Sequence, residues 1–179
     1  MDRRQLIIVG KIVLLLAFAV VLQTVLISQV SILGVTADLF LILTVIVAVS
    51  RGSLQGAVFG FIVGLMADTA YFSLLGVRAL IYVLVGYFVG MFVVRFGTVS
   101  PWSVALLTGV TSFLAQLLFG VFQYVMGPSG GFFTMIGVQM IPEAVLDGLV
   151  AAPLYVVLLR TRLLPAPASD GVQFGGEEE

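Results

Sequence analysis

Six apolar stretches, each long enough to cross a membrane as a helix, restrict the fold more than any other feature of this sequence. A helix needs roughly 20 apolar residues to cross a hydrocarbon core about 30 Å thick. The stretches have the approximate bounds 12–30, 33–50, 53–71, 76–94, 101–126 and 139–159. Spanning segments in lipid must satisfy their own backbone hydrogen bonds, as a helix does. The sequence therefore predicts an all-α integral membrane bundle of six transmembrane helices, in one domain over residues 1–162.

Composition agrees with lipid as the solvent. Charged residues make up 9% of the chain, hydrophobic residues make up 61%, and the mean hydropathy is +1.24. A typical soluble domain carries about 25% charged residues, so this chain has too few to cover itself in water. Residues 163–179 are rich in proline and glycine and end in three glutamates. They are expected to form a disordered acidic cytoplasmic tail.

The basic residues predict the orientation in the membrane. Lysine and arginine concentrate in cytoplasmic loops. If the N-terminus is cytoplasmic, seven of the eight basic residues fall on the cytoplasmic side, and only Arg78 falls on the outer side. The seven are Arg3, Arg4, Lys11, Arg51, Arg95, Arg160 and Arg162. Both termini are therefore expected in the cytoplasm.

A row of glycines at four-residue spacing marks the third stretch. Its members are Gly52, Gly56, Gly60 and Gly64, and Asp68 takes the next place in the series. Glycine costs about 1 kcal/mol relative to alanine in a helix, but in lipid small residues let two helices approach closely. The row is expected to form an inclined groove for a neighbouring helix that crosses at about −40°. Three occupants stay open: the 76–94 helix with Gly86 and Gly90, a helix of a separate protein, or a second copy in a homodimer.

Charged residues within the apolar stretches are candidate functional groups. Asp68 and Arg78 lie one short loop apart, so they are a candidate ion pair, with a ligand or partner contact as the alternative. Asp38 is placed to cap the second helix. Glu143 and Asp147 are four residues apart, on one helical face.

Asp38, Glu143 and Asp147 form an outer acidic cluster of unknown role. With Asp68 they outnumber Arg78, their only basic neighbour on that side. Three accounts stay open: a carboxyl is kept protonated by its burial, a cation, ligand or basic partner residue completes the set, or Glu143 faces water.

The residue types argue against catalysis. The chain has no histidine and no cysteine, which removes the commonest general base, thiol chemistry, disulfides and histidine-based metal sites. It contains no phosphate-binding loop and no HExxH motif. The expectations are no enzyme activity, no cofactor, no metal and no nucleic-acid partner.

Three segments carry a resemblance to a known family. They are "GAVFGFIVGLMAD" at 56–68, "LLGVRALIYVLVGYFVG" at 74–90 and "IPEAVLDGLVAAPLYVVLLR" at 141–160. Together with the size, the six stretches and the two inside termini, they resemble MreD, the rod shape-determining membrane protein of bacteria, over about residues 12–160. The resemblance implies a fold similar to the S-components of energy-coupling-factor transporters.

The resemblance also implies a role without catalysis. It implies a non-enzymatic scaffold in the bacterial inner membrane that binds the bitopic protein MreC. Through MreC it would connect to MreB and to the peptidoglycan glycosyltransferase and transpeptidase. We hypothesise that MreC docks on the Gly52–Asp68 row. The alternative function is a substrate-binding S-component of a vitamin or metal transporter. Those proteins often carry an AxxxA row on the first span, whereas Ala17 and Ala19 are two apart here, which favours MreD.

Overall fold

The computed structural model describes residues 36–70, 76–97, 100–126 and 136–160, and every element in them is helical. The elements are α2 (Leu39–Arg51), α3 (Ser53–Ala70), α4 (Val77–Phe96), α5 (Pro101–Met126), the π-helical η1 (Ile136–Met140) and α7 (Ile141–Arg160). The predicted first span at 12–30 and the predicted tail at 163–179 lie outside the described residues. The all-helical fold is confirmed for the described part of the chain.

Four of these helices are long and apolar enough to cross a membrane. They are α3, α4, α5 and α7, and their bounds agree with the predicted stretches to within a few residues. The second stretch, predicted at 33–50, is shorter than expected, because α2 begins at Leu39 and has 13 residues. At 1.5 Å per residue it is about 20 Å long, less than the hydrocarbon core. The full count of six spans stays a prediction.

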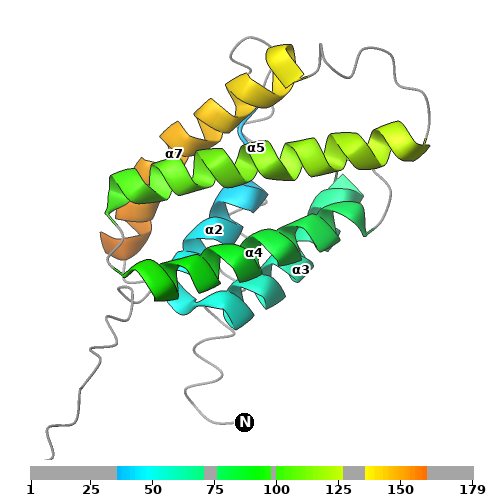
Figure 1. Cartoon of the computed structure of the whole chain (residues 1–179). Helices are drawn as coiled ribbons and strands as arrows, with labels where there is room; N and C mark the ends of the chain where they lie inside the picture. The colour runs from blue at the N-terminus through cyan, green and yellow to red at the C-terminus, as the bar shows by residue number, and fades with distance from the viewer. Residues whose placement is uncertain (1–35, 71–75, 98–99, 127–135, 161–179) are drawn as a thin grey trace, which may run out of the picture.

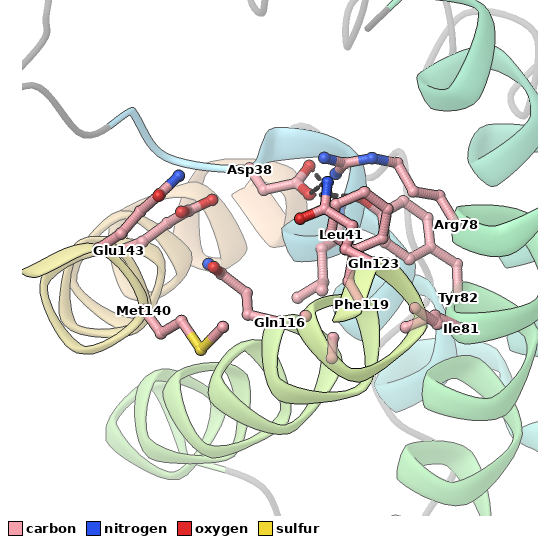
Figure 2. A pocket seen from close by; sticks show the side chains of 13 residues that line it. Asp38, Leu41, Arg78, Ile81, Tyr82, Gln116, Phe119, Gln123, Met140 and Glu143 are labelled. Atoms are coloured by element: carbon pink, nitrogen blue, oxygen red, sulfur yellow. Dashed lines mark hydrogen bonds and ion pairs between the residues drawn. The ribbon is translucent and has the colours of Figure 1, made fainter. Parts of the chain in front are cut away.

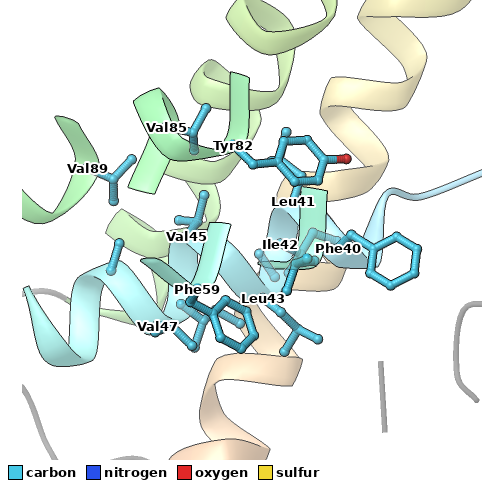
Figure 3. Packing of buried hydrophobic residues seen from close by; sticks show 14 of the residues in the cluster. Phe40, Leu41, Ile42, Leu43, Val45, Val47, Phe59, Tyr82, Val85 and Val89 are labelled. Atoms are coloured by element: carbon cyan, nitrogen blue, oxygen red, sulfur yellow. The ribbon is translucent and has the colours of Figure 1, made fainter. Parts of the chain in front are cut away.

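Helix α2 lies at the centre of the bundle. All its residues from Leu39 to Ser50 are buried, and it contacts α3, α4, α5 and α7. Figure 1 shows it between the α3–α4 pair and the α5–α7 pair. Figure 3 shows its side chains packed with Phe59 of α3 and with Val85 and Val89 of α4. A helix that is surrounded by other helices needs apolar side chains on all its faces. The sequence of α2, apolar on every face, fits this central position.

The other four long helices turn large apolar side chains outward. These exposed residues include Leu54, Val58, Phe61, Leu80, Phe88, Phe92, Trp102, Leu106, Val110, Leu118, Val121, Val145, Leu149 and Val157. Soluble monomers rarely expose contiguous apolar patches larger than a few hundred Å². The outer surface of the bundle is therefore the surface that meets lipid.

The charged residues separate to opposite ends of the bundle. Contacts that join Asp38, Arg78 and Asp147 bring the N-terminal parts of α2, α4 and α7 together at one end. We call this the acidic end. Each of these three helices has an arginine in its last turn, so these arginines lie at the other end. This separation agrees with the predicted orientation, in which the arginines at the ends of α2, α4 and α7 face the cytoplasm.

Candidate functional site

The glycine row of α3 is closed by α4, with α2 beside it. A Cβ built on Gly56 would lie 2.7 Å from the carbonyl oxygen of Gly86 and 2.6 Å from the Cβ of Ala48. A Cβ on Gly60 would overlap the carbonyl group of Tyr82, and one on Gly64 would overlap the backbone of Ala79. At these positions any side chain would collide with backbone, so glycine is required by the close approach of the two helices.

Two glycines of α4 complete the contact from the other side. A Cβ on Gly86 would meet the backbone of Gly56, and one on Gly90 would meet the backbone of Ser53. The pairs Gly56–Gly86 and Ser53–Gly90 define one antiparallel register. The sequence left three occupants of the groove open. In the structure the occupant is α4, a helix of the same chain. It leaves no room for a partner helix or a second copy over Gly56–Gly64.

Gly52 differs from the other members of the predicted row. It precedes α3, has a φ of +88°, and forms the C-cap of α2 with its N–H donating to the Ala48 carbonyl at 2.9 Å. A Cβ there would meet nothing within 4 Å. Glycine serves at this position for its left-handed backbone, which ends α2 and lets α3 begin. Gly52 also borders the row, because a Cβ on Gly90 would lie 2.6 Å from its carbonyl carbon. Its place in the packing row stays a prediction.

Asp68 caps the N-terminus of α4 from the end of α3. It is fully buried, and its carboxylate accepts hydrogen bonds from the backbone N–H groups of Gly76 at 2.7 Å, Arg78 at 3.2 Å and Ala79 at 3.4 Å. The first N–H groups of a helix have no partner within the helix, and they carry its positive dipole end. Asp68 therefore supplies the hydrogen-bond acceptor for the first N–H groups of α4, the helix that packs on the glycine row of α3.

The guanidinium of Arg78 lies next to a different acid from the one predicted. Its Nη1 is 3.6 Å from Oδ2 of Asp38, and its Cζ lies 4.5 Å from the centre of the Phe119 ring. The hydrogen bond from Arg78 to Asp68 is donated by the backbone N–H of Arg78. A side-chain ion pair between Asp68 and Arg78 stays a prediction.

Asp38 and Asp147 form a buried network that joins four helices. As predicted, Asp38 caps α2, accepting from the N–H groups of Phe40 at 3.1 Å and Leu41 at 3.2 Å. Its own N–H donates to Asp147 at 2.8 Å. The hydroxyl of Tyr82 donates to Asp38, and that of Ser112 donates to Asp147. Sequence reasoning missed Tyr82 and Ser112, because a hydroxyl within an apolar helix gives no sign of which acid it meets.

The network predicts different outcomes for two changes at Asp147. Asparagine can still accept from the Asp38 N–H and can donate to the Ser112 hydroxyl, so Asp147→Asn will change stability by less than about 1 kcal/mol. Asp147→Ala leaves both donors buried and will cost about 2–4 kcal/mol. Reversible unfolding of the purified protein in mixed micelles measures both values. Equal losses for the two variants would show that the charge of Asp147, rather than its hydrogen bonds, stabilises the bundle.

A polar cavity of about 380 Å³ opens beside this network. Its walls come from α2, α4, α5, η1 and α7, and Figure 2 shows Glu143 and Gln116 reaching toward the same space. The lining residues are Asp38, Leu41, Arg78, Ile81, Tyr82, Ala115, Gln116, Phe119, Gly120, Gln123, Gln139, Met140 and Glu143. Of the predicted acidic cluster, Asp38 and Glu143 line the cavity, and Asp147 lies behind the wall. Pro142 lies in the first turn of α7, into which η1 runs directly.

A second hollow of about 640 Å³ is an apolar groove between α5 and α7. Its lining residues are Trp102, Ala105, Leu106, Gly109, Val110, Phe113, Leu114, Ile141, Ala144, Val145, Gly148, Leu149, Ala152 and Pro153. The two helices approach closely at Gly148, where a Cβ would lie 2.8 Å from the Ala105 carbonyl oxygen. We call this surface the α5–α7 groove.

The site chemistry and the fold define a class of protein. Among the described residues, no three His, Cys, Asp or Glu side chains are placed to hold a metal ion. Asp38, Asp68 and Asp147 accept hydrogen bonds from backbone or hydroxyl donors. These features define a membrane protein built from closely packed helices, four of them long and apolar enough to cross a membrane.

Comparison with known proteins gives the family. A family model described as rod shape-determining protein MreD matches residues 3–161. The chain belongs to the MreD family, a family of shape-determining membrane proteins that is not known for enzymatic activity, and its role is in rod-shape determination. The searches of curated proteins and of solved structures each found no match.

Proposed function

We propose that this protein is a non-enzymatic scaffold of the cell-elongation machinery that binds the single span of MreC in the bacterial inner membrane. Membership of the MreD family supports this role. Through MreC the scaffold would connect MreB in the cytoplasm to the peptidoglycan glycosyltransferase and transpeptidase outside. Both termini lie in the cytoplasm in this proposal, which puts the acidic end on the outer side.

The observation that carries the proposal is the α5–α7 groove. The glycine row, our first candidate for the MreC seat, is closed by α4 over Gly56–Gly64. The groove is open and its walls are almost entirely apolar. Small residues line it at Ala105, Gly109 and Ala152, and small residues permit close helix contact in lipid. We therefore propose the α5–α7 groove, in place of the glycine row, as the binding site of the MreC span.

A bulky side chain in the groove will weaken MreC binding without unfolding the bundle. Val110 and Val145 line the groove and are more than half exposed. We expect Val110→Trp and Val145→Trp each to reduce the amount of MreC that co-purifies in mild detergent by at least about tenfold, the effect of 1.4 kcal/mol. The matched control is Phe88→Trp, on an equally exposed site of α4, which should co-purify MreC normally.

Two results would overturn the proposal. The first is that Val110→Trp and Val145→Trp both co-purify MreC normally, while the control Phe88→Trp loses MreC. The other is co-purification of an ABC-type ATPase pair in place of a bitopic protein, which would support the S-component alternative.

A further inference from the structure

We propose that the polar cavity at the acidic end binds a small molecule that carries a positively charged amine next to hydrogen-bonding oxygen atoms. The ammonium group would lie at Glu143, and the oxygen atoms would accept from the amide of Gln116. This site shares no lining residue with the α5–α7 groove, so the inference is independent of the proposed MreC contact.

The size of the cavity suits a small organic molecule. Small-molecule sites in proteins are typically about 300–1,000 Å³ in volume, and the cavity has about 380 Å³. An organic molecule of comparable volume fits it.

The charges on the walls favour a cationic group. Asp38 and Glu143 line the cavity with a single cation, Arg78. The Arg78 guanidinium is held between Asp38 and the Phe119 ring. The two oxygens of Asp147, behind the wall, accept from the Asp38 N–H and the Ser112 hydroxyl. Among the described residues no cation lies within ion-pair distance of Glu143. An ionised carboxylate without a paired cation costs several kcal/mol in a membrane bundle, so an ammonium group at Glu143 would stabilise its ionised form.

The amides on the walls favour further polar atoms on the ligand. The Nε2 of Gln116 is buried and has no hydrogen-bond partner among the described residues. The Glu143 carboxyl is close enough to interact with it, but outside hydrogen-bond geometry. An unmet buried donor is costly, and a ligand oxygen would satisfy it. Gln123 and Gln139 on the same walls offer further donors and acceptors.

Ligand-induced thermal stabilisation of the full-length protein in nanodiscs tests the inference. The probes are three amines with their uncharged counterparts: ethanolamine with ethylene glycol, 4-aminobutanol with 1,4-butanediol, and glucosamine with glucose. We expect at least one amine to raise Tm saturably by about 5 °C, and its uncharged counterpart to leave Tm unchanged. Glu143→Gln and Gln116→Leu should each abolish the shift.

The matched control for Gln116→Leu is Gln55→Leu, an exposed glutamine of α3 that does not line the cavity; it should keep the full shift. Each shift is measured against the Tm of the same variant, so a change in basal stability does not hide the result. If one cavity variant fails to fold, the other decides. The inference is overturned if no amine shifts Tm, if the uncharged counterparts shift it equally, or if the shift survives in a folded cavity variant.

Discussion

Gly60→Ala will separate α3 from α4 and reduce the free energy of unfolding by about 3 kcal/mol or more. Alanine is the better helix former, so an isolated helix would gain stability from this change. In the bundle, the new Cβ would overlap the carbonyl group of Tyr82. Backbone cannot rotate away as a flexible side chain can, so the two helices must move apart and lose contact along the whole row. Unfolding in mixed micelles measures the loss.

Two other glycines provide matched controls for this prediction. A Cβ on Gly109 would lie 3.2 Å from the Ala144 carbonyl oxygen, a contact that small shifts can relieve, and one on Gly137 would meet nothing within 4 Å. We expect Gly109→Ala to cost about 1 kcal/mol and Gly137→Ala to be neutral. If Gly60→Ala were as mild as Gly137→Ala, the close approach of α3 and α4 would be wrong.

Asp68→Asn will be almost as damaging as Asp68→Ala, because the Asp68 carboxylate accepts hydrogen bonds from three backbone N–H groups. Alanine leaves all three donors without their acceptor, at about 1–3 kcal/mol each, the cost being largest for the buried N–H of Ala79. Asparagine can keep an acceptor oxygen for Gly76 and Ala79, which share Oδ2, but it then turns an NH2 group toward the N–H of Arg78. We expect losses of at least 3 kcal/mol for alanine and about 2–3 kcal/mol for asparagine. This contrasts with Asp147, where asparagine should be tolerated.

The neighbouring Thr69 supplies the control for Asp68. Its hydroxyl bonds within α3, to the Leu65 carbonyl at 2.6 Å, so Thr69→Val should change stability by less than about 0.5 kcal/mol. The charge exchange Asp68→Arg with Arg78→Asp should restore nothing, since an arginine at 68 cannot accept from α4. Full rescue by the exchange would show that Asp68 acts through its charge on Arg78 and not as a cap.

The sequence predicts the bounds of the four long helices, α3, α4, α5 and α7, better than those of the central helix α2. Apolar length along the chain is enough to locate α3, α4, α5 and α7. The second stretch is equally apolar, but its helix is short and central, and length alone cannot separate a buried helix from a spanning one. The Asp38 cap marks the true start of α2, and this local signal was read correctly from the sequence.

The candidate site was predicted only in part, because its contacts join distant segments. Asp38 and Arg78 are 40 positions apart, and the choice of Asp38 as the neighbour of the Arg78 guanidinium depends on how α2 and α4 lie side by side. The same holds for Ser112 and Asp147, 35 positions apart. Four-residue spacing predicted that Gly56, Gly60 and Gly64 share one face, since that follows from the helix itself. Which helix covers that face was decided by the fold.

Cysteine cross-linking in membranes tests most directly the claim that α4 closes the glycine row. The chain has no native cysteine, so pairs can be introduced without background. By the register of the contact, Ala57 lies beside the row on α3, and Val83 and Tyr87 lie beside it on α4. The account predicts rapid cross-links within one chain for Ala57→Cys paired with Val83→Cys or Tyr87→Cys. The pair Leu54→Cys with Phe88→Cys, which points away from the contact, should give none. Cross-links from Ala57→Cys to MreC or to a second copy, with none to α4, would contradict the account.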